Sequence, residues 1–412
     1  MPKIDFDKLH EEIIEETKEL FTYHEKISLH NTQKILDAFR NNQVSDYYFH
    51  ASSGYGYADT GRDALDKIYA EVFGAQKALV RSQFVSGTHS IATALLGILN
   101  SGDQMLAVTG KPYDTLQTVI GTNGQQPGSL IDKGINYKEI PLTDTGRVDF
   151  AAIKETVTEN TKLVHIQRSR GYANRKSLSV EEIGEICKLV KKQNAACICF
   201  VDNCYGEFVE KQEPTQVGAD IMAGSLIKNP GGGLAPSGGY IVGREDLVQL
   251  AAFQFTAPGL GSEMGATHGD VQRLLYQGFF LAPHVTLQAV KTAIYATFLF
   301  EKLGYKVSPN KNELRSDIIL SINLNEESNL LEFCQAIQKY SPVDAHVLPY
   351  PGYMPGYQDE VIMAAGTFIQ GASIELSADG PLRPPYTVFL QGGLTFEHSV
   401  IALLSAAKNI LS

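Results

Sequence analysis

The chain has 412 residues, of which 43% are hydrophobic and 20% are charged, and its formal net charge at pH 7 is −11. This is the composition of a globular protein long enough for two or three domains, whose core needs no disulfide or structural metal. The acidic balance, without any basic block, argues against nucleic acid or an anionic membrane as a partner.

No apolar run approaches the ~20 residues that would cross a bilayer. The N-terminal segment lacks the basic-then-apolar pattern of a signal peptide. The chain has five cysteines without a repeating spacing, which is typical of a reducing compartment. Cys197 and Cys199 have no second pair that would complete a zinc site. We therefore expect a soluble, cytoplasmic protein.

The chain begins with a predicted helix over residues 6–41. Leu9, Ile13 and Leu20 recur at helical spacing opposite an acidic face, so this helix either packs on the body or contributes to subunit contacts. Residues 51–61 follow as a loop rich in glycine and tyrosine, and such surface loops commonly carry binding residues.

Short apolar runs then alternate with amphipathic stretches, which predicts an α/β domain with a mainly parallel sheet flanked by helices. In such sheets ligands gather at the carboxyl ends of the strands, so the residues that follow each apolar run are candidates for a site. The expected strands are 78–80, 105–108, 162–166, 196–201, 221–223 and 239–242, and the expected helices are 87–100, 115–121 and 180–192.

A long apolar-periodic helix over residues 271–303, interrupted near Pro283, predicts a connection to a smaller α+β domain. We divide the chain into a helical arm (1–50), a large domain (51–290) and a C-terminal domain (291–412). The elements expected in the last part are strands at 318–324, 361–363, 372–376 and 387–390 and helices at 330–340 and 395–411.

Lys228 follows an apolar strand and precedes the turn Asn-Pro-Gly-Gly-Gly. A lysine condenses with an aldehyde cofactor, and a serine three residues earlier, here Ser225, can bond that cofactor's phosphate. Asp202 also follows a strand directly, where a carboxylate can keep the pyridine nitrogen of pyridoxal 5′-phosphate (PLP) protonated. The alternatives are a surface lysine beside a turn and an aspartate that caps a helix, and the two motifs together favour the cofactor.

Ser86, Gly87 and Thr88 form a small-residue turn before a predicted helix. The unpaired N–H groups of such a turn can bind a phosphate, although an ordinary helix cap has the same pattern. No Walker motif occurs, and no strand precedes Gly54-Tyr-Gly56, which argues against a nucleotide or dinucleotide site.

With these residues in place, the chain resembles fold-type-I PLP enzymes of the methionine γ-lyase and cystathionine lyase branch. It is most similar to the divergent aluminium resistance protein group of that branch. The resemblance runs from about Tyr55 to the C-terminus, and the motifs that carry it are GYGYADTGRDALDKIYAEVFGAQKALVRSQFVSGTHS, VDNCYGEF, GSLIKNPGGGLAPSGGYIVG and LRPPYTVFLQGGLTFEH. It implies an aminotransferase-like fold.

The resemblance also implies roles for single residues. Lys228 would hold PLP covalently, Asp202 would pair with its ring nitrogen, and Tyr113 would stack on the ring and act as a candidate acid. The phosphate would be held by Ser225, Ser86, Gly87 and Thr88. Tyr55 and Tyr57 would reach the neighbouring subunit's cofactor, so a homodimer or homotetramer with shared sites is expected. The candidates for binding the substrate are Arg383, Arg168, Arg170 and Asn174.

The implied activity is a PLP-dependent carbon–sulfur lyase acting on a sulfur-containing amino acid, of the methionine γ-lyase or cystathionine β/γ-lyase type. The alternatives are an aminotransferase, aldolase or decarboxylase of the same fold, or a PLP-binding stress protein with little turnover. Ile227 stands where the family has a second phosphate-binding hydroxyl. The family's C-terminal arginine has no match, and Arg383 is the best substitute because a guanidinium fits a carboxylate at two points.

Overall fold

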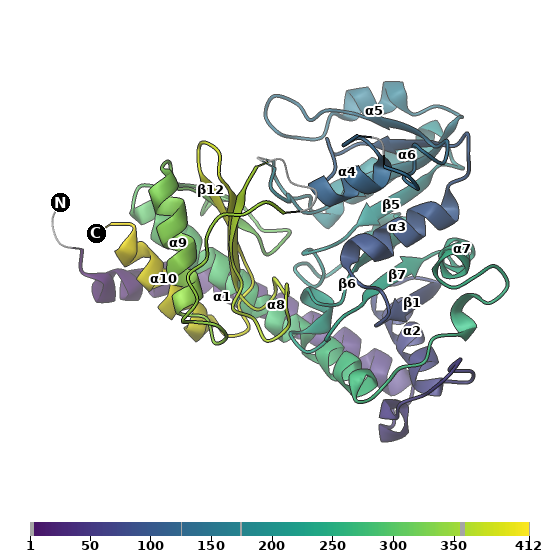
Figure 1. Ribbon diagram of the computed structural model, residues 1–412, viewed down its shortest axis with the longest axis horizontal. Coiled ribbons are helices and arrows are strands. Elements are labelled where there is room, and N and C mark those ends of the chain that lie inside the picture. The colour runs from purple at the N-terminus through teal and green to yellow at the C-terminus, as the bar shows by residue number, and fades with distance from the viewer. Residues whose placement is uncertain (1–3, 125, 174, 355–358, 412) are drawn as a thin grey trace.

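The computed structural model describes residues 4–124, 126–173, 175–354 and 359–411, and within them it contains two sheets. Two long helices, α1 (Phe6–Asn41) and α8 (Val271–Lys302), pack against each other and run beneath both sheets (Figure 1). They join the two halves of the molecule, which explains why both helices carry buried residues along their length.

The large sheet has the strand order β1-β7-β6-β5-β4-β2-β3. Strands β3, β2, β4, β5 and β6 pair in parallel, and β7 pairs antiparallel with both β6 and β1. This confirms the predicted mainly parallel sheet. The strands are β1 (Lys77–Arg81), β2 (Gln104–Ala107), β3 (Asn136–Glu139), β4 (Thr161–Gln167), β5 (Ile198–Asp202), β6 (Ile221–Ser225) and β7 (Gly239–Gly243).

Helices cover both faces of this sheet. One face packs against α3, α4 and α7, and the other against α2, α5, α6 and the first half of α8. All residues of β5 and β6 are buried, as their continuous apolar sequences predict. The helices are α2 (Thr60–Val72), α3 (Gly87–Ile98), α4 (Asp114–Ile120), α5 (Phe150–Thr156), α6 (Val180–Gln193) and α7 (Glu245–Phe255).

The smaller sheet is antiparallel, with the order β10-β11-β12-β9-β8, and packs against α9 and α10. The prediction of a strand over residues 372–376 is wrong, because these residues form turns and the strand begins at Ser377. Ala372, Ile374 and Leu376 are nevertheless buried, so the apolar run reflects their place in the core and not a strand. The elements are β8 (Lys306–Ser308), β9 (Leu320–Asn323), α9 (Glu327–Lys339), β10 (Val361–Ala364), β11 (Ser377–Pro381), β12 (Thr387–Gln391) and α10 (Phe396–Asn409).

Helix α8 continues through Pro283, so the predicted interruption there is also wrong. The Pro283 carbonyl accepts a hydrogen bond from Ser28 Oγ of α1 at 3.1 Å, so α1 packs against α8 at the proline, which removes one backbone N–H donor from the helix. The proposed domain boundary at residue 290 falls inside α8.

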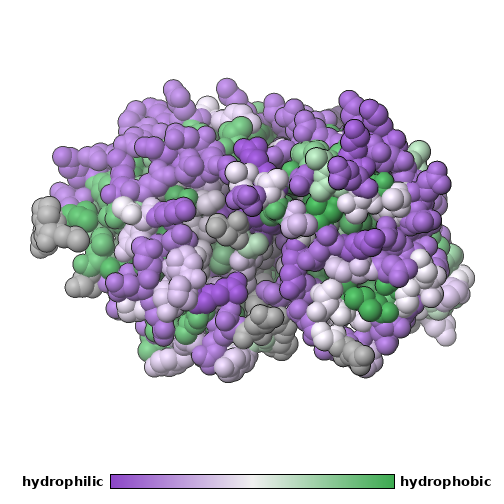
Figure 2. Space-filling model, turned by 90° about the horizontal axis from the view of Figure 1, so that it is seen from above, coloured by the Kyte–Doolittle hydropathy of each residue, from purple (hydrophilic) through white to green (hydrophobic). Residues whose placement is uncertain are grey.

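None of the helices in the described ranges is long and apolar enough to span a bilayer. Figure 2 shows hydrophilic side chains over most of one face, with hydrophobic side chains in small scattered groups.

Candidate active site

Lys228 lies at the end of the large sheet, just beyond β6, and begins the short 3-10 helix Asn229–Gly231. Close backbone contacts fix this turn. A Cβ on Gly231 would lie 1.7 Å from the Leu226 carbonyl oxygen, and one on Gly232 would lie 2.2 Å from the Gly278 carbonyl oxygen of α8. The glycines after Lys228 are therefore required for tight packing against α8.

The Lys228 ammonium faces other functional groups. Its Nζ lies 3.7 Å from the centroid of the Tyr205 ring, and the described residues give it no ion pair. Burial alone would lower the pKa of Lys228, but the acidic groups of Cys204, Tyr205 and Asp202 outweigh burial and raise that pKa above its ordinary value. Lys228 is thus a partly buried amine among acidic groups, as a site residue would be.

Asp202 is the last residue of β5 and is 3% exposed. Turns follow it through residue 209, so it does not cap a helix. Its Oδ1 accepts a hydrogen bond from the Cys204 N–H at 3.1 Å. Burial raises the pKa of Asp202, while the positive charge of Lys228 partly offsets that rise. The carboxylate and the amine are therefore in electrostatic contact, as a cofactor lying between them would require.

The N-terminus of α3 meets the ends of β5 and β6. Ser86 caps the helix, since its Oγ accepts a hydrogen bond from the His89 N–H at 3.1 Å. A Cβ on Gly87 would lie 3.0 Å from the Ser225 Cβ and 3.5 Å from the Cys204 Sγ. A side chain at position 87 would crowd Ser225, and the Gly87 and Thr88 N–H groups, which have no hydrogen bond with the described residues, are available to an anion at this helix terminus.

Tyr113 comes from a third loop, just before α4. Its hydroxyl lies 3.0 Å from Thr88 Oγ1, and its N–H donates to Gln167 Oε1 at 3.0 Å. Burial, followed by the negative charge of Asp202, raises the pKa of Tyr113, so its phenol stays protonated. The structure therefore brings together the predicted residues Lys228, Asp202, Ser225, Ser86, Gly87, Thr88 and Tyr113.

The small domain adds a carboxyl group that the sequence did not reveal. Asp379 of β11 is 5% exposed, and Gln391 Nε2 donates to it at 3.2 Å. Burial raises the pKa of Asp379 to about 7, and the Tyr172 hydroxyl and the charge of Lys228 act in the opposite direction. Tyr205 was missed as well, although it lies within the quoted VDNCYGEF motif and has a positive φ of 72°.

Arg168 is structural, which corrects its assignment as a substrate-binding residue, and Arg170 bonds to groups of the small domain. The Arg168 side chain is fully buried and forms ion pairs with Glu210 at 2.9 Å and with Glu213 at 3.3 Å. Arg170 donates to the Ser308 carbonyl oxygen and to Ser321 Oγ, each at 2.8 Å. Arg168 thus fixes a loop of the large domain, and Arg170 ties the two domains together.

The other predicted contacts differ in their surroundings. Arg383 is exposed, pairs with Asp359 at 2.9 Å, and lines a cavity of about 160 Å³ together with Tyr172. Burial raises the pKa of Asp114, next to Tyr113, and the charge of Arg383 partly offsets that rise, so Arg383 lies near the mouth of the site. Asn174 lies outside the described residues.

Tyr55 and Tyr57 are 66% and 63% exposed, and their ring centroids lie 5.5 Å apart. Their loop is anchored, since Arg62 Nη1 donates to the Gly56 carbonyl oxygen at 2.8 Å. Both rings face away from the body of one chain, and their role in a neighbouring subunit stays a prediction.

The chain is similar in sequence and in fold to proteins from several bacteria. YnbB of Bacillus subtilis is 52% identical over 388 residues, which is 94% of this chain and 92% of that protein. A carbon-sulfur lyase involved in aluminum resistance from Clostridium novyi is 48% identical, with a TM-score of 0.94 over 98% of this chain and 95% of that chain. YhfS, a PLP-dependent protein from Escherichia coli, is 15% identical, with a TM-score of 0.62 over 92% of this chain and 96% of that chain.

The likeness to YhfS shows the fold alone, and it confirms the predicted fold of PLP-dependent enzymes. The family described as methionine gamma-lyase matches residues 6–411, a range that includes every element around Lys228. The likeness to the Clostridium novyi protein confirms the resemblance to the aluminium resistance group. The chain belongs to the methionine gamma-lyase family.

Proposed function

We propose that this protein is a PLP-dependent carbon–sulfur lyase acting on a sulfur-containing amino acid. The observation that carries the proposal is the meeting of the Lys228 amine, the Asp202 carboxylate and the α3 N-terminus at one edge of the large sheet. Family membership and the carbon-sulfur lyase from Clostridium novyi support the same reaction class.

The residues present fit PLP. Lys228 would hold its aldehyde carbon, Asp202 its ring nitrogen, and Tyr113 one face of its ring. Ser225 lies beside Gly87 at the N-terminus of α3, so the two residues would hold the phosphate from adjoining elements. When bound, PLP withdraws electrons from the substrate's Cα and stabilises the negative charge that forms there.

The side chains of this chain have separate roles in the proposed reaction. The Lys228 amine takes the proton from Cα, and the Asp202 carboxylate keeps the ring nitrogen protonated throughout. Burial keeps the Tyr113 phenol protonated, and in this proposal Tyr113 would give its proton to the departing sulfur. Arg383 offers the planar two-point contact that the substrate's α-carboxylate needs. With one water consumed, the products are a thiol, ammonia and a 2-oxo acid.

We also propose that the protein works in the cytoplasm as a homodimer or homotetramer. Exposed aromatic rings are common at interfaces between chains, and Tyr55 and Tyr57 form such a pair on an anchored loop. Light scattering coupled to size exclusion would test this assembly, and a monomer would contradict it.

An assay of thiol, ammonia and 2-oxo acid release tests the function. Purified, PLP-loaded protein would be incubated with cysteine, cystathionine, methionine and homocysteine separately. We expect thiol release from at least one of them. We expect Lys228→Ala to lower it by about 10²–10⁴-fold or more and to lose the cofactor's absorbance band, because the base and the covalent attachment are removed together.

Lys188→Ala is the matched control, since Lys188 is an exposed lysine of α6 without a described ion pair, and its activity should be unchanged. Exchange of amino groups without thiol release would contradict the lyase assignment. Retention of both the absorbance band and turnover in Lys228→Ala would contradict the site itself.

A further inference from the structure

A cavity of about 330 Å³ lies where the two domains meet. Its walls come from the loop before α5, from the segment between β4 and α6, and from the loop that precedes β9 in the small domain. None of the residues assigned to PLP lines it, so it is distinct from the candidate active site.

The charged side chains that line this cavity are mostly basic. The basic ones are Arg147, Arg170, Arg175 and Lys176, and the acidic ones are Glu182 and Glu313. Both acids already have partners. Glu182 accepts a hydrogen bond from the Ser179 N–H at 2.9 Å as part of the capping box of α6. Glu313 pairs with Lys176 and accepts a hydrogen bond from the Asn310 N–H at 2.9 Å. Four basic side chains of the lining therefore face two acidic ones, and the charge of Glu313 acts on Arg170 as well as pairing with Lys176.

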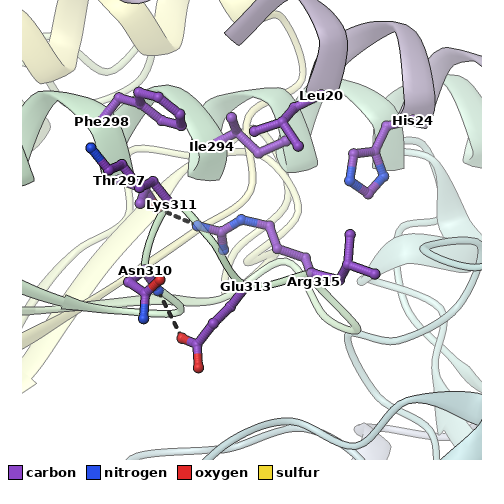
Figure 3. Close-up of a pocket in the computed structure, with 10 residues that line it drawn as sticks. Leu20, His24, Ile294, Thr297, Phe298, Asn310, Lys311, Glu313 and Arg315 are labelled. Carbon is purple, nitrogen blue, oxygen red and sulfur yellow. Dashed lines mark hydrogen bonds between the residues drawn. The ribbon is translucent and has the colours of Figure 1, made fainter. Parts of the chain in front are cut away.

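Arg170 and Arg175 of the lining and Arg315 behind it are buried, and the buried carboxylate of Asp317 acts on all three. Glu313 also acts on Arg170 and Arg315, and Asp202 acts on Arg175. Burial, followed by the like charge of Arg170, lowers the pKa of Arg175 to about 10. The third arginine, Arg315, lines a neighbouring pocket between α1 and α8, where its guanidinium donates to Thr297 Oγ1 (Figure 3) and to the Ala293 carbonyl oxygen at 2.9 Å. This region therefore has more buried cations than buried anions.

Two donors at the cavity have no partner among the described residues. Arg170 is 1% exposed, and its Nε is buried without a hydrogen bond. The Arg147 guanidinium is exposed at the cavity and has neither an ion pair nor a hydrogen bond with the described part of the chain. A buried unpaired donor is unfavourable and is normally satisfied by a ligand or water.

We propose that this cavity binds a small divalent anion, a phosphate monoester or a dicarboxylate, through Arg147, Arg170 and Arg175. Guanidinium groups bind both anions with paired hydrogen bonds, and a divalent charge balances the local excess of cations. Because the walls come from both domains, the bound anion also holds the loop before β9 against the large domain. The proposal does not depend on which reaction the protein catalyses.

Calorimetric titration of the PLP-loaded protein tests this site, with inorganic phosphate in one arm and succinate in the other. We expect one saturable site per chain for at least one of the two anions, and the tighter binder identifies the anion class. Arg147→Ala should weaken binding by at least tenfold, and Arg147→Lys should weaken it less because the charge is kept. Lys188→Ala, which removes an exposed charge elsewhere on α6, should bind like the wild type.

The cofactor's absorbance is followed in the same titration. Loss of that absorbance with phosphate would place the anion at the cofactor's own phosphate site and would overturn the proposal. Absence of saturable binding in both arms, or equal affinity in Arg147→Ala and the wild type, would overturn it as well. None of these readouts requires turnover, so a failed lyase assay would leave this test intact.

Discussion

Three buried arginines, Arg168, Arg170 and Arg175, follow β4 within a few residues of each other. Arg168 is neutralised by ion pairs within the chain, whereas Arg170 and Arg175 are not. Arg168 has two carboxylates and an amide within hydrogen-bond distance, contributed by Glu210, Glu213 and Asn203. Arg170 and Arg175 share the carboxylate of Asp317 with a third arginine, and neither of them forms an ion pair among the described residues.

The difference separates a structural cation from one available to a ligand. A buried charge is tolerated when it is paired and hydrogen-bonded, and the Arg168 group meets this condition from within the chain. The Arg170–Arg175 group does not, and it borders a cavity, whereas Arg168 lines none of the cavities described above. An unbalanced buried group beside a cavity is therefore a better guide to a ligand than a buried arginine alone.

Breaking the ion pairs of Arg168 should lower the free energy of unfolding most. Glu213→Ala removes a fully buried carboxylate that binds Arg168 and accepts a hydrogen bond from the Phe208 N–H at 2.8 Å. We expect the free energy of unfolding to fall by about 3–5 kcal/mol, because Arg168 is left buried beside one partner fewer. Urea denaturation of the holoprotein measures this loss.

Glu210→Ala is the matched control, since Glu210 pairs with the same arginine but is 27% exposed. Its loss should cost only about 1 kcal/mol. Equal losses in the two variants would show that burial does not distinguish these partners.

Removing the Asp317 carboxylate, which Arg170 and Arg175 share, should lower the free energy of unfolding by an intermediate amount. Asp317→Asn removes the one carboxylate that acts on all three buried guanidinium groups but keeps an oxygen for the Ile319 N–H. We expect a loss of about 2–3 kcal/mol in the absence of added anion. Phosphate should then restore more stability to this variant than to the wild type, because its cavity is more positive.

The melting temperature at increasing phosphate concentration measures this recovery. The control is Asp246→Asn, because Asp246 is 59% exposed and pairs with Arg244 on the surface. A uniform response of the wild type and both variants to phosphate would contradict the difference between the two arginine groups.

The same contrast explains what could be predicted from the sequence. Lys228 and Asp202 each directly follow an apolar strand, and the carboxyl ends of neighbouring parallel strands meet at one edge, so local patterns place both residues. Arg168 satisfies the same local rule but was assigned wrongly, because its partners lie 42 and 45 residues further along the chain. Strand β3 was missed because its residues are largely exposed and leave no apolar run.

Asp379 is a third case, a buried carboxyl group that is protonated and therefore uncharged over part of the pH range. It has no ion pair with a described cation, and burial raises its pKa from 3.8 to about 7. Between these two values the native state binds more protons than the unfolded chain, so the free energy of unfolding should fall as pH rises through that range. Glu207, whose pKa burial raises to about 8, acts in the same direction.

Asp379→Asn should therefore reduce this pH dependence without abolishing it, because Glu207 remains. We expect the slope of the free energy of unfolding against pH to fall by up to about 1.4 kcal/mol per pH unit over the range in which Asp379 titrates, measured by urea denaturation at several pH values. Asp246→Asn is again a suitable control, because its ion pair with Arg244 lowers the pKa of Asp246, and that contribution is lost only at more acidic pH. An unchanged slope in Asp379→Asn would mean that Asp379 is ionised and paired in the native protein, and that it belongs with Arg168 among the balanced charges.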